Sequence, residues 1–133
     1  MSGSEWTDPR PMSPHLQVWK WHWTMAASIF HRVTGIGNYL GAILVSVWII
    51  SIAAGEEAYS FVEGIMLSAV GQILLFFWLA SVLFHFFNGI RHLLWDGPKV
   101  GFSPKVASLW SIFNFAAALV AAATIWSLAT NLF

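Results

Sequence analysis

Three long stretches without charged side chains dominate the sequence. Asp, Glu, Lys and Arg are absent from residues 33–55, 64–90 and 106–133, which are runs of 23, 27 and 28 residues. About 20 apolar residues are enough for a helix to cross the hydrocarbon core of a bilayer. The pattern therefore predicts an all-α fold with three transmembrane helices. We expect these helices over residues of about 24–54, 61–95 and 106–133.

The residues before the first stretch have a different pattern. Pro9, Pro11 and Pro14 forbid a regular helix, so residues 1–22 are expected to form an extended segment. The segment lacks the apolar core of a secretory signal, and its acidic residues are unlike an Arg-rich mitochondrial presequence. We therefore expect residues 1–133 to form a single membrane-anchor domain in a bacterial inner membrane, with the mitochondrial inner membrane as the alternative.

Composition excludes several classes of function. Only 9% of the 133 residues are charged, whereas a soluble domain usually carries about a quarter. There is no Cys, which rules out disulfides, thiolate chemistry and cysteine-ligated iron–sulfur clusters within this chain. The formal net charge is zero, so nothing in the charge indicates a nucleic-acid partner.

The basic residues predict how the spans are oriented. They precede the first span or lie between the second and third: Arg10, Lys20, Arg32, Arg91, Lys99 and Lys105. The connection between the first two spans holds three acids and no base, and no charged side chain follows Lys105. Because basic residues favour the cytoplasmic side, we expect a cytoplasmic N-terminus and an extracytoplasmic C-terminus.

The spans themselves suggest how they pack. Gly37 and Gly41 form a G-x-x-x-G pattern, which allows another helix to approach closely. The second span, at 61–95, is longer than a bilayer requires, so we expect it to tilt or to protrude on the cytoplasmic side. The third span has no ionisable side chain, and we interpret it as a packing helix.

A polar stripe lies at the end of the second span. His85, Gly89, His92 and Asp96 follow the i, i+4, i+7, i+11 spacing of one helical face. An ionisable side chain as deep as His85 indicates a functional site, and neutral imidazole is a good axial ligand for haem iron. Gly89 leaves room for a flat macrocycle. His85 is therefore a candidate haem ligand; the alternative is a structural hydrogen bond to a neighbouring helix.

A second polar cluster lies in the first span. Arg32 and His31 offer charge-assisted hydrogen bonds to haem propionates. Ser28 lies one turn from Arg32, and together they offer donors to the two carbonyl oxygens of a quinone. Gly35 follows them in the sequence. Two structural alternatives stay open: Ser28 bonded to a carbonyl of its own helix, and Arg32 as a snorkelling base that only sets topology.

His92 and Asp96 form a candidate proton relay. An acid at the C-terminus of a helix opposes the helix dipole, so Asp96 needs a basic partner or a role in proton transfer. His92 lies close to the predicted interface, and an ordinary interfacial histidine is the alternative interpretation.

Three segments make the chain resemble the cytochrome b membrane-anchor subunit of succinate dehydrogenase, the larger hydrophobic subunit of respiratory complex II. The resemblance extends over about the whole chain, although the first and third spans match mainly in hydropathy. The segments are Arg10-Pro11-Met12-Ser13-Pro14-His15-Leu16, Ser28-x-x-His31-Arg32-x-Thr34-Gly35 and His85-x-x-x-Gly89-Ile90-Arg91-His92-Leu93-x-Trp95-Asp96.

The resemblance implies a function and a set of partners. His85 would be one axial ligand of haem b, and a second hydrophobic anchor subunit would supply the other histidine. Ser28 and Arg32 would line the ubiquinone site, with His31 and Arg32 near the haem propionates. An iron–sulfur subunit and a flavoprotein subunit would pass electrons from succinate to ubiquinone, and this chain alone would catalyse nothing. Two alternatives remain open: the anchor of a fumarate reductase working in reverse, and a haem-free structural anchor within the same larger helical bundle.

Overall fold

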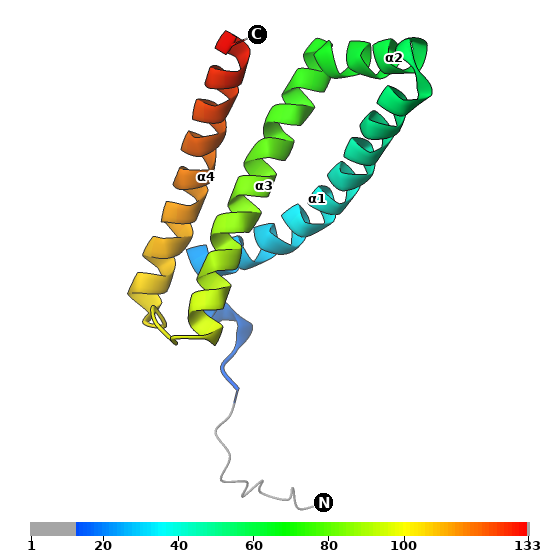
Figure 1. The fold of residues 1–133 in the computed structure, drawn as a ribbon. Helices are drawn as coiled ribbons and strands as arrows, with labels where there is room; N and C mark the ends of the chain where they lie inside the picture. Colours follow the sequence, from blue (N-terminus) through cyan, green and yellow to red (C-terminus); the bar gives the residue numbers. More distant parts are fainter. Residues whose placement is uncertain (1–12, 133) are drawn as a thin grey trace, which may run out of the picture.

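The computed structural model describes residues 13–132, and this part of the chain contains helices and no strand (Figure 1). Three of the helices, α1, α3 and α4, are each long and apolar enough to cross a membrane. The predicted all-α fold with three candidate spans is therefore confirmed. Of the expected extended segment, residues 1–12 lie outside the described range. The elements are a short 3-10 turn, η1 (Leu16–Val18), and the helices α1 (Trp23–Ala54), α2 (Glu56–Leu67), α3 (Ala69–Asp96) and α4 (Pro104–Leu132).

The helices α3 and α4 lie side by side and run in opposite directions, whereas α1 crosses them at an angle and comes nearest to both at one end (Figure 1). This is the end at which α1 begins, α3 ends and α4 begins, and we call it the α3–α4 loop end. From there α1 leans away from α3, and α2 joins their far ends. The two polar clusters predicted from the sequence both fall at the α3–α4 loop end.

The expected second span of 61–95 is wrong in its first part, because the chain turns at Ser68 and the membrane-spanning helix begins at Ala69. Ser68 has an extended backbone, and its Oγ accepts a hydrogen bond from the main-chain N–H of Gly71 at 3.1 Å. This bond caps the new helix. A Cβ on Gly71 would collide with the carbonyl oxygen of Ile65, so glycine is needed for the tight turn. The first residues of the expected span, 61–67, belong to a separate helix. The extra length of this span therefore does not protrude beyond the α3–α4 loop end.

That separate helix, α2, begins directly after Gly55, whose φ of 113° suits a residue without a side chain. Glu56 and Glu57 lie in its first turn, where negative charge interacts favourably with the helix dipole. The Tyr59 hydroxyl donates a hydrogen bond to Glu63 at 2.8 Å. This bond raises the pKa of Tyr59 above its ordinary value, since ionisation would place a second negative charge beside the carboxylate.

One of the two glycines of the G-x-x-x-G pattern brings α1 close to α3. Gly41 is buried, and a Cβ there would collide with the indole ring of Trp78. A Cβ on Gly37 would meet nothing within 4 Å, so the face of α1 at this glycine is open. Between these helices Ser81 Oγ also donates to Asn38 Oδ1 at 2.9 Å. Of the predicted pattern, Gly41 thus contacts α3, where it makes room for the indole ring of Trp78.

A small apolar core joins α1, α3 and α4. Ala27, Phe84 and Ala118 are buried together, one from each helix. The ring of Phe115 stacks on Phe84 with centroids 4.4 Å apart. Small residues at such positions let the helix backbones approach each other, as is usual where helices pack within a membrane.

Candidate functional site

Three histidine rings gather at the α3–α4 loop end. His31 of α1 stacks on His85 of α3, with ring centroids 3.9 Å apart and planes 15° apart. The ring centroid of His31 also lies 5.1 Å from that of His92. The sequence predicted a role for each of these residues, and the structure brings all three into one cluster.

Two oxygen atoms of α1 face the Nδ1 atom of His85. The main-chain carbonyl oxygen of His31 lies 3.1 Å from it, and the hydroxyl of Thr34 lies 3.2 Å from it. Thr34 has one hydroxyl proton, and it points to the carbonyl oxygens of its own helix, with Phe30 at 2.7 Å. Both oxygens therefore accept a hydrogen bond, so Nδ1 of His85 carries the proton and Nε2 carries the lone pair.

This arrangement fits a haem ligand. Histidines that bind metal usually donate their second ring N–H to a carbonyl or similar acceptor, which fixes the tautomer and the ring orientation. Among the described residues, no hydrogen bond reaches His85 Nε2. A Cβ on Gly35 would lie 3.2 Å from His85 Cε1, so this glycine lets the imidazole seat against α1. A Cβ on Gly89 would meet nothing within 4 Å, which leaves open space beside the stripe.

The part of the chain that the structure describes does not bring a full set of metal ligands together. Within residues 13–132 there is no group of three or more His, Cys, Asp or Glu side chains arranged to hold a metal ion. A haem iron needs one or two axial ligands from protein, and His85 can provide one of them.

Ser28 and Arg32 carry polar groups that the described part of the chain does not use. Ser28 is half-buried, and its hydroxyl makes no hydrogen bond there, whereas Ser46 and Ser51 bond back to carbonyls of the same helix. The alternative in which Ser28 bonds its own helix is thus not observed. Arg32 is exposed and has no ion pair within residues 13–132. Although it follows His31 in sequence, it takes no part in the histidine cluster.

His92 and Asp96 are one turn apart on α3, but no hydrogen bond joins them. His92 Nε2 instead lies 3.3 Å from the amide nitrogen of Asn88. Asp96 is the last residue of α3 and is exposed. The structure therefore places both near the same end without linking them into a direct relay.

A buried arginine was missed in the sequence, where Arg91 served only to predict topology. It is 2% exposed, and its Nη1 atom donates a hydrogen bond to Ser111 Oγ on α4. The guanidinium carbon lies 4.5 Å from the ring centroid of Trp95, a distance suited to a cation–π interaction. The interpretation of the third span as a packing helix was therefore incomplete, because α4 presents buried Ser111 and Asn114 to α3.

Three buried nitrogen atoms near this end have no hydrogen-bond partner among the residues described: His31 Nδ1, Arg91 Nε and Trp95 Nε1. Buried donors are rarely left unpaired in native proteins. These three nitrogen atoms are therefore an unusual feature of the α3–α4 loop end.

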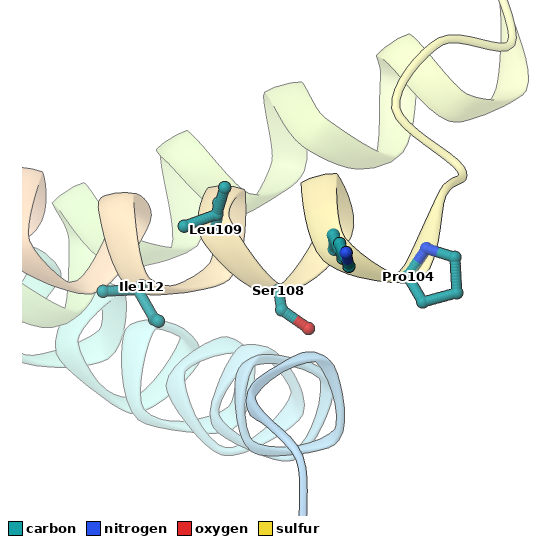
Figure 2. Close-up of a pocket in the computed structure, with 5 residues that line it drawn as sticks. Pro104, Ser108, Leu109 and Ile112 are labelled. Carbon is teal, nitrogen blue, oxygen red and sulfur yellow. The ribbon is translucent and has the colours of Figure 1, made fainter.

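The first turns of α4 border a shallow hollow of about 540 Å³ at the same end. Figure 2 shows Ser108 and Ile112 projecting into it from α4, with Pro104 at the start of the helix. Lys105 and Leu109 complete its lining. None of the histidines or of the predicted quinone residues borders this hollow, so we do not assign the chemistry to it.

Comparison with known proteins gives one consistent family. A family model described as "Succinate dehydrogenase/Fumarate reductase transmembrane subunit" matches residues 7–125. The chain is 37% identical over 102 residues to the mitochondrial succinate dehydrogenase cytochrome b560 subunit of Mus musculus, which covers 73% of this chain and 59% of that protein. It is 31% identical over 105 residues to the succinate dehydrogenase cytochrome b556 subunit of Rickettsia bellii, covering 77% and 81%.

A further relative is the succinate dehydrogenase cytochrome b556 subunit of Paracoccus denitrificans, 31% identical over 87 residues, with 65% of this chain and 67% of that protein covered. The chain spans between half and two thirds of the length of the mammalian relatives that it matches. The relatives include both bacterial and mitochondrial proteins.

The fold and the site thus define a multi-pass, all-helical membrane subunit with an imidazole cluster near one end of its spans. The chain belongs to the family of succinate dehydrogenase/fumarate reductase transmembrane subunits, and it is similar to the cytochrome b subunits of succinate dehydrogenase.

Proposed function

We propose that this chain is the haem-binding anchor subunit of a succinate:quinone oxidoreductase and that His85 is one axial ligand of haem b. The observation that carries the proposal is the hydrogen bonding of His85, whose Nδ1–H is held by α1 while Nε2 stays available. Such an arrangement prepares an imidazole to bind iron. The relatives are named as cytochrome b subunits, and these names support haem b as the bound group.

The haem, when bound, supplies one-electron transfer, and this chain supplies binding and orientation. A second hydrophobic anchor subunit would provide the other histidine for the haem. His31 and Arg32 would hold the propionates, since a cationic side chain strengthens a hydrogen bond to a carboxylate. Gly35 and Gly89 keep side chains away from the ligand and from the space beside it.

Ubiquinone is the substrate reduced at the same end of the membrane span. The hydroxyl of Ser28 and the guanidinium of Arg32 are one helical turn apart, and they bind the quinone oxygens. Arg32 stabilises the negative charge that develops on a quinone oxygen as it is reduced. His92 and Asp96 are the groups of this chain available for a relay of the protons that reduction consumes.

The subunit anchors a flavoprotein subunit and an iron–sulfur subunit, which deliver electrons from succinate. They dock at the α3–α4 loop end, which carries the histidine cluster and the candidate quinone residues. The basic residues near this end favour its placement on the cytoplasmic side of a bacterial inner membrane, with the C-terminus outside.

A spectrum of the purified complex tests the proposal. We expect a reduced-minus-oxidised spectrum with a b-type band, co-purification of the flavoprotein, the iron–sulfur subunit and a second anchor, and succinate-dependent reduction of ubiquinone. A complex that lacks the b-type band yet reduces quinone would contradict the assignment of His85 and favour a structural anchor.

A further inference from the structure

A chain of two buried amides connects α4 to His92. Asn114 is 6% exposed and Asn88 is fully buried. The Asn114 Nδ2 atom donates to Asn88 Oδ1 over 3.5 Å, and Asn88 Nδ2 lies 3.3 Å from His92 Nε2. Nothing in the proposed chemistry explains why two amides are buried inside an apolar bundle, where an unpaired polar group is costly.

The direction of these hydrogen bonds fixes the tautomer of His92. Because Asn88 Oδ1 accepts from Asn114, the NH2 group of Asn88 is the one that faces His92. An amide NH2 only donates, so Nε2 of His92 must be the acceptor and carry no proton. The proton of the neutral ring is then on Nδ1.

The same amides make His92 a poor carrier of protons. A neutral imidazole with its proton on Nδ1 gains a second proton only at Nε2, and that position already accepts a hydrogen bond from Asn88. Asn88 would have to turn its amide over to free Nε2, and this would break its bond to Asn114.

The charged surroundings of His92 do not decide its state by themselves. On α3 it is faced by Arg91, which disfavours a second positive charge, and by Asp96, which favours one. On α1 it is faced by the ring of His31. From α4 it is approached only through the uncharged amides, so their hydrogen bonds are the specific constraint.

We propose that Asn88 and Asn114 are positioning residues that hold His92 as a neutral hydrogen-bond donor through Nδ1–H. Its partner is an oxygen acceptor from outside this chain, a carboxylate or a quinone oxygen. The Nδ1 atom has no hydrogen bond within residues 13–132, and the His92 side chain is half-buried. This inference rests on the proposed quinone and haem chemistry, but it revises the proposed relay: His92 serves as a hydrogen-bond donor, and proton transfer is left to Asp96.

The tautomer can be measured directly. In the membrane-embedded complex with isotope-labelled histidine, subtracting the solid-state NMR spectrum of His92→Leu isolates the ring signals of His92. We expect a protonated Nδ1 and an unprotonated Nε2 at neutral pH. A wild-type ring that is protonated on Nε2, or on both nitrogen atoms under these conditions, would overturn the proposal.

A matched pair of variants tests the role of the amides. Asn114→Leu keeps the size of the side chain but removes the donor to Asn88, so we expect a mixture of tautomers or a charged ring. Asn131→Leu, on the exposed last turn of α4, should leave the His92 signals unchanged. If Asn114→Leu gives the wild-type signals, the amides do not control the ring.

A second pair separates a donor from a proton carrier in the quinone assay. His92→Asn places an N–H near the position of Nδ1 but cannot carry a proton, whereas His92→Leu has neither property. We expect His92→Leu to lower quinone reduction roughly fivefold or more, the effect of a lost hydrogen bond, and His92→Asn to stay within about twofold of wild type. Equal losses in both variants would show that His92 carries protons.

The outcomes also separate this inference from the function on which it rests. If His92→Leu leaves quinone reduction unchanged while the NMR spectrum shows the expected tautomer, the placement of the quinone site is wrong and the positioning role stands. If the tautomer is absent while His92→Leu is impaired, the positioning role is wrong and the site stands.

Discussion

The Nδ1 atom of His85 lies 3.1 Å from the main-chain carbonyl oxygen of His31 on the neighbouring helix. This contact joins α3 to α1 at the level of the histidine cluster and sets the direction in which Nε2 points. The hydroxyl of Thr34 adds a second acceptor at 3.2 Å. The orientation of the candidate ligand is therefore set by α1, although the ligand itself belongs to α3.

Thr34→Val removes one of the two acceptors and keeps the shape of the side chain. We expect haem to be retained, because the carbonyl of His31 still accepts from Nδ1, but its midpoint potential to change, since hydrogen bonding to the ligand tunes the iron. Potentiometric titration of the b-type band measures this. Thr124→Val, whose hydroxyl bonds only its own helix, serves as the control, and an unchanged potential in Thr34→Val would contradict the role.

Gly35→Ala places a methyl group 3.2 Å from His85 Cε1. The ring must shift by a few tenths of an ångström, so we expect a displaced or broadened b-type absorption band and lower haem content. Gly37→Ala is the matched control, because a Cβ there meets nothing within 4 Å. Equal spectra for the two variants would show that the close approach at Gly35 does not affect the ligand.

Ser28→Ala separates the quinone role from the haem role. It removes one hydroxyl, and the loss of a typical hydrogen bond to the substrate costs roughly 1 kcal/mol. We therefore expect the rate of ubiquinone reduction to fall about fivefold. Haem content and succinate oxidation with a soluble dye should survive. Arg32→Ala should be more impaired, since it removes a charge-assisted bond. Loss of haem with normal quinone reduction in Ser28→Ala would place Ser28 in the haem pocket.

Ser111→Ala leaves the buried guanidinium of Arg91 without its partner on α4. Leaving a buried charged donor without a partner is expected to lower the free energy of unfolding by about 1.5–3 kcal/mol. The complex should therefore unfold at a lower temperature. Ser108→Ala, one turn earlier and partly exposed, should have an effect within about 0.5 kcal/mol. Equal unfolding temperatures in differential scanning calorimetry would show that the bond between Arg91 and Ser111 contributes little.

Hydropathy was enough to predict the three spans, because a membrane requires long uncharged helices. Helix geometry also put His85 and His92 on one stripe, because their spacing in the sequence matches the repeat of a helix. The break at Ser68 was not foreseen, because the sequence stays apolar on both sides and the cap depends on how Ser68 and Gly71 meet in space. Hydropathy cannot distinguish one long helix from two joined by a capped turn.

The buried polar residues were also beyond the sequence. Arg91 and Ser111 meet only because α3 and α4 pack along particular faces, and no pattern in either span fixes that choice. A clue was available: Asn88 and Arg91 are three residues apart, as are Ser111 and Asn114. Polar pairs at this spacing on two apolar helices could have predicted that these faces turn toward each other.

The adjacency of His31 and Arg32 was misleading in one respect. Neighbouring helical residues point about 100° apart, and the structure turns His31 toward His85 while Arg32 stays exposed. The shared role at the propionates that their adjacency suggested remains a prediction, because Arg32 takes no part in the cluster.

The assignment of His85 is tested most directly by the reduced-minus-oxidised spectrum of two variant complexes. His85→Leu removes the imidazole whose Nε2 is free, so we predict that the b-type band is lost or strongly perturbed. His92→Leu, on the same stripe, should keep the band, since His92 Nε2 already accepts a hydrogen bond from Asn88. A band that survives in His85→Leu and disappears in His92→Leu would show that His92 is the ligand and would contradict the account.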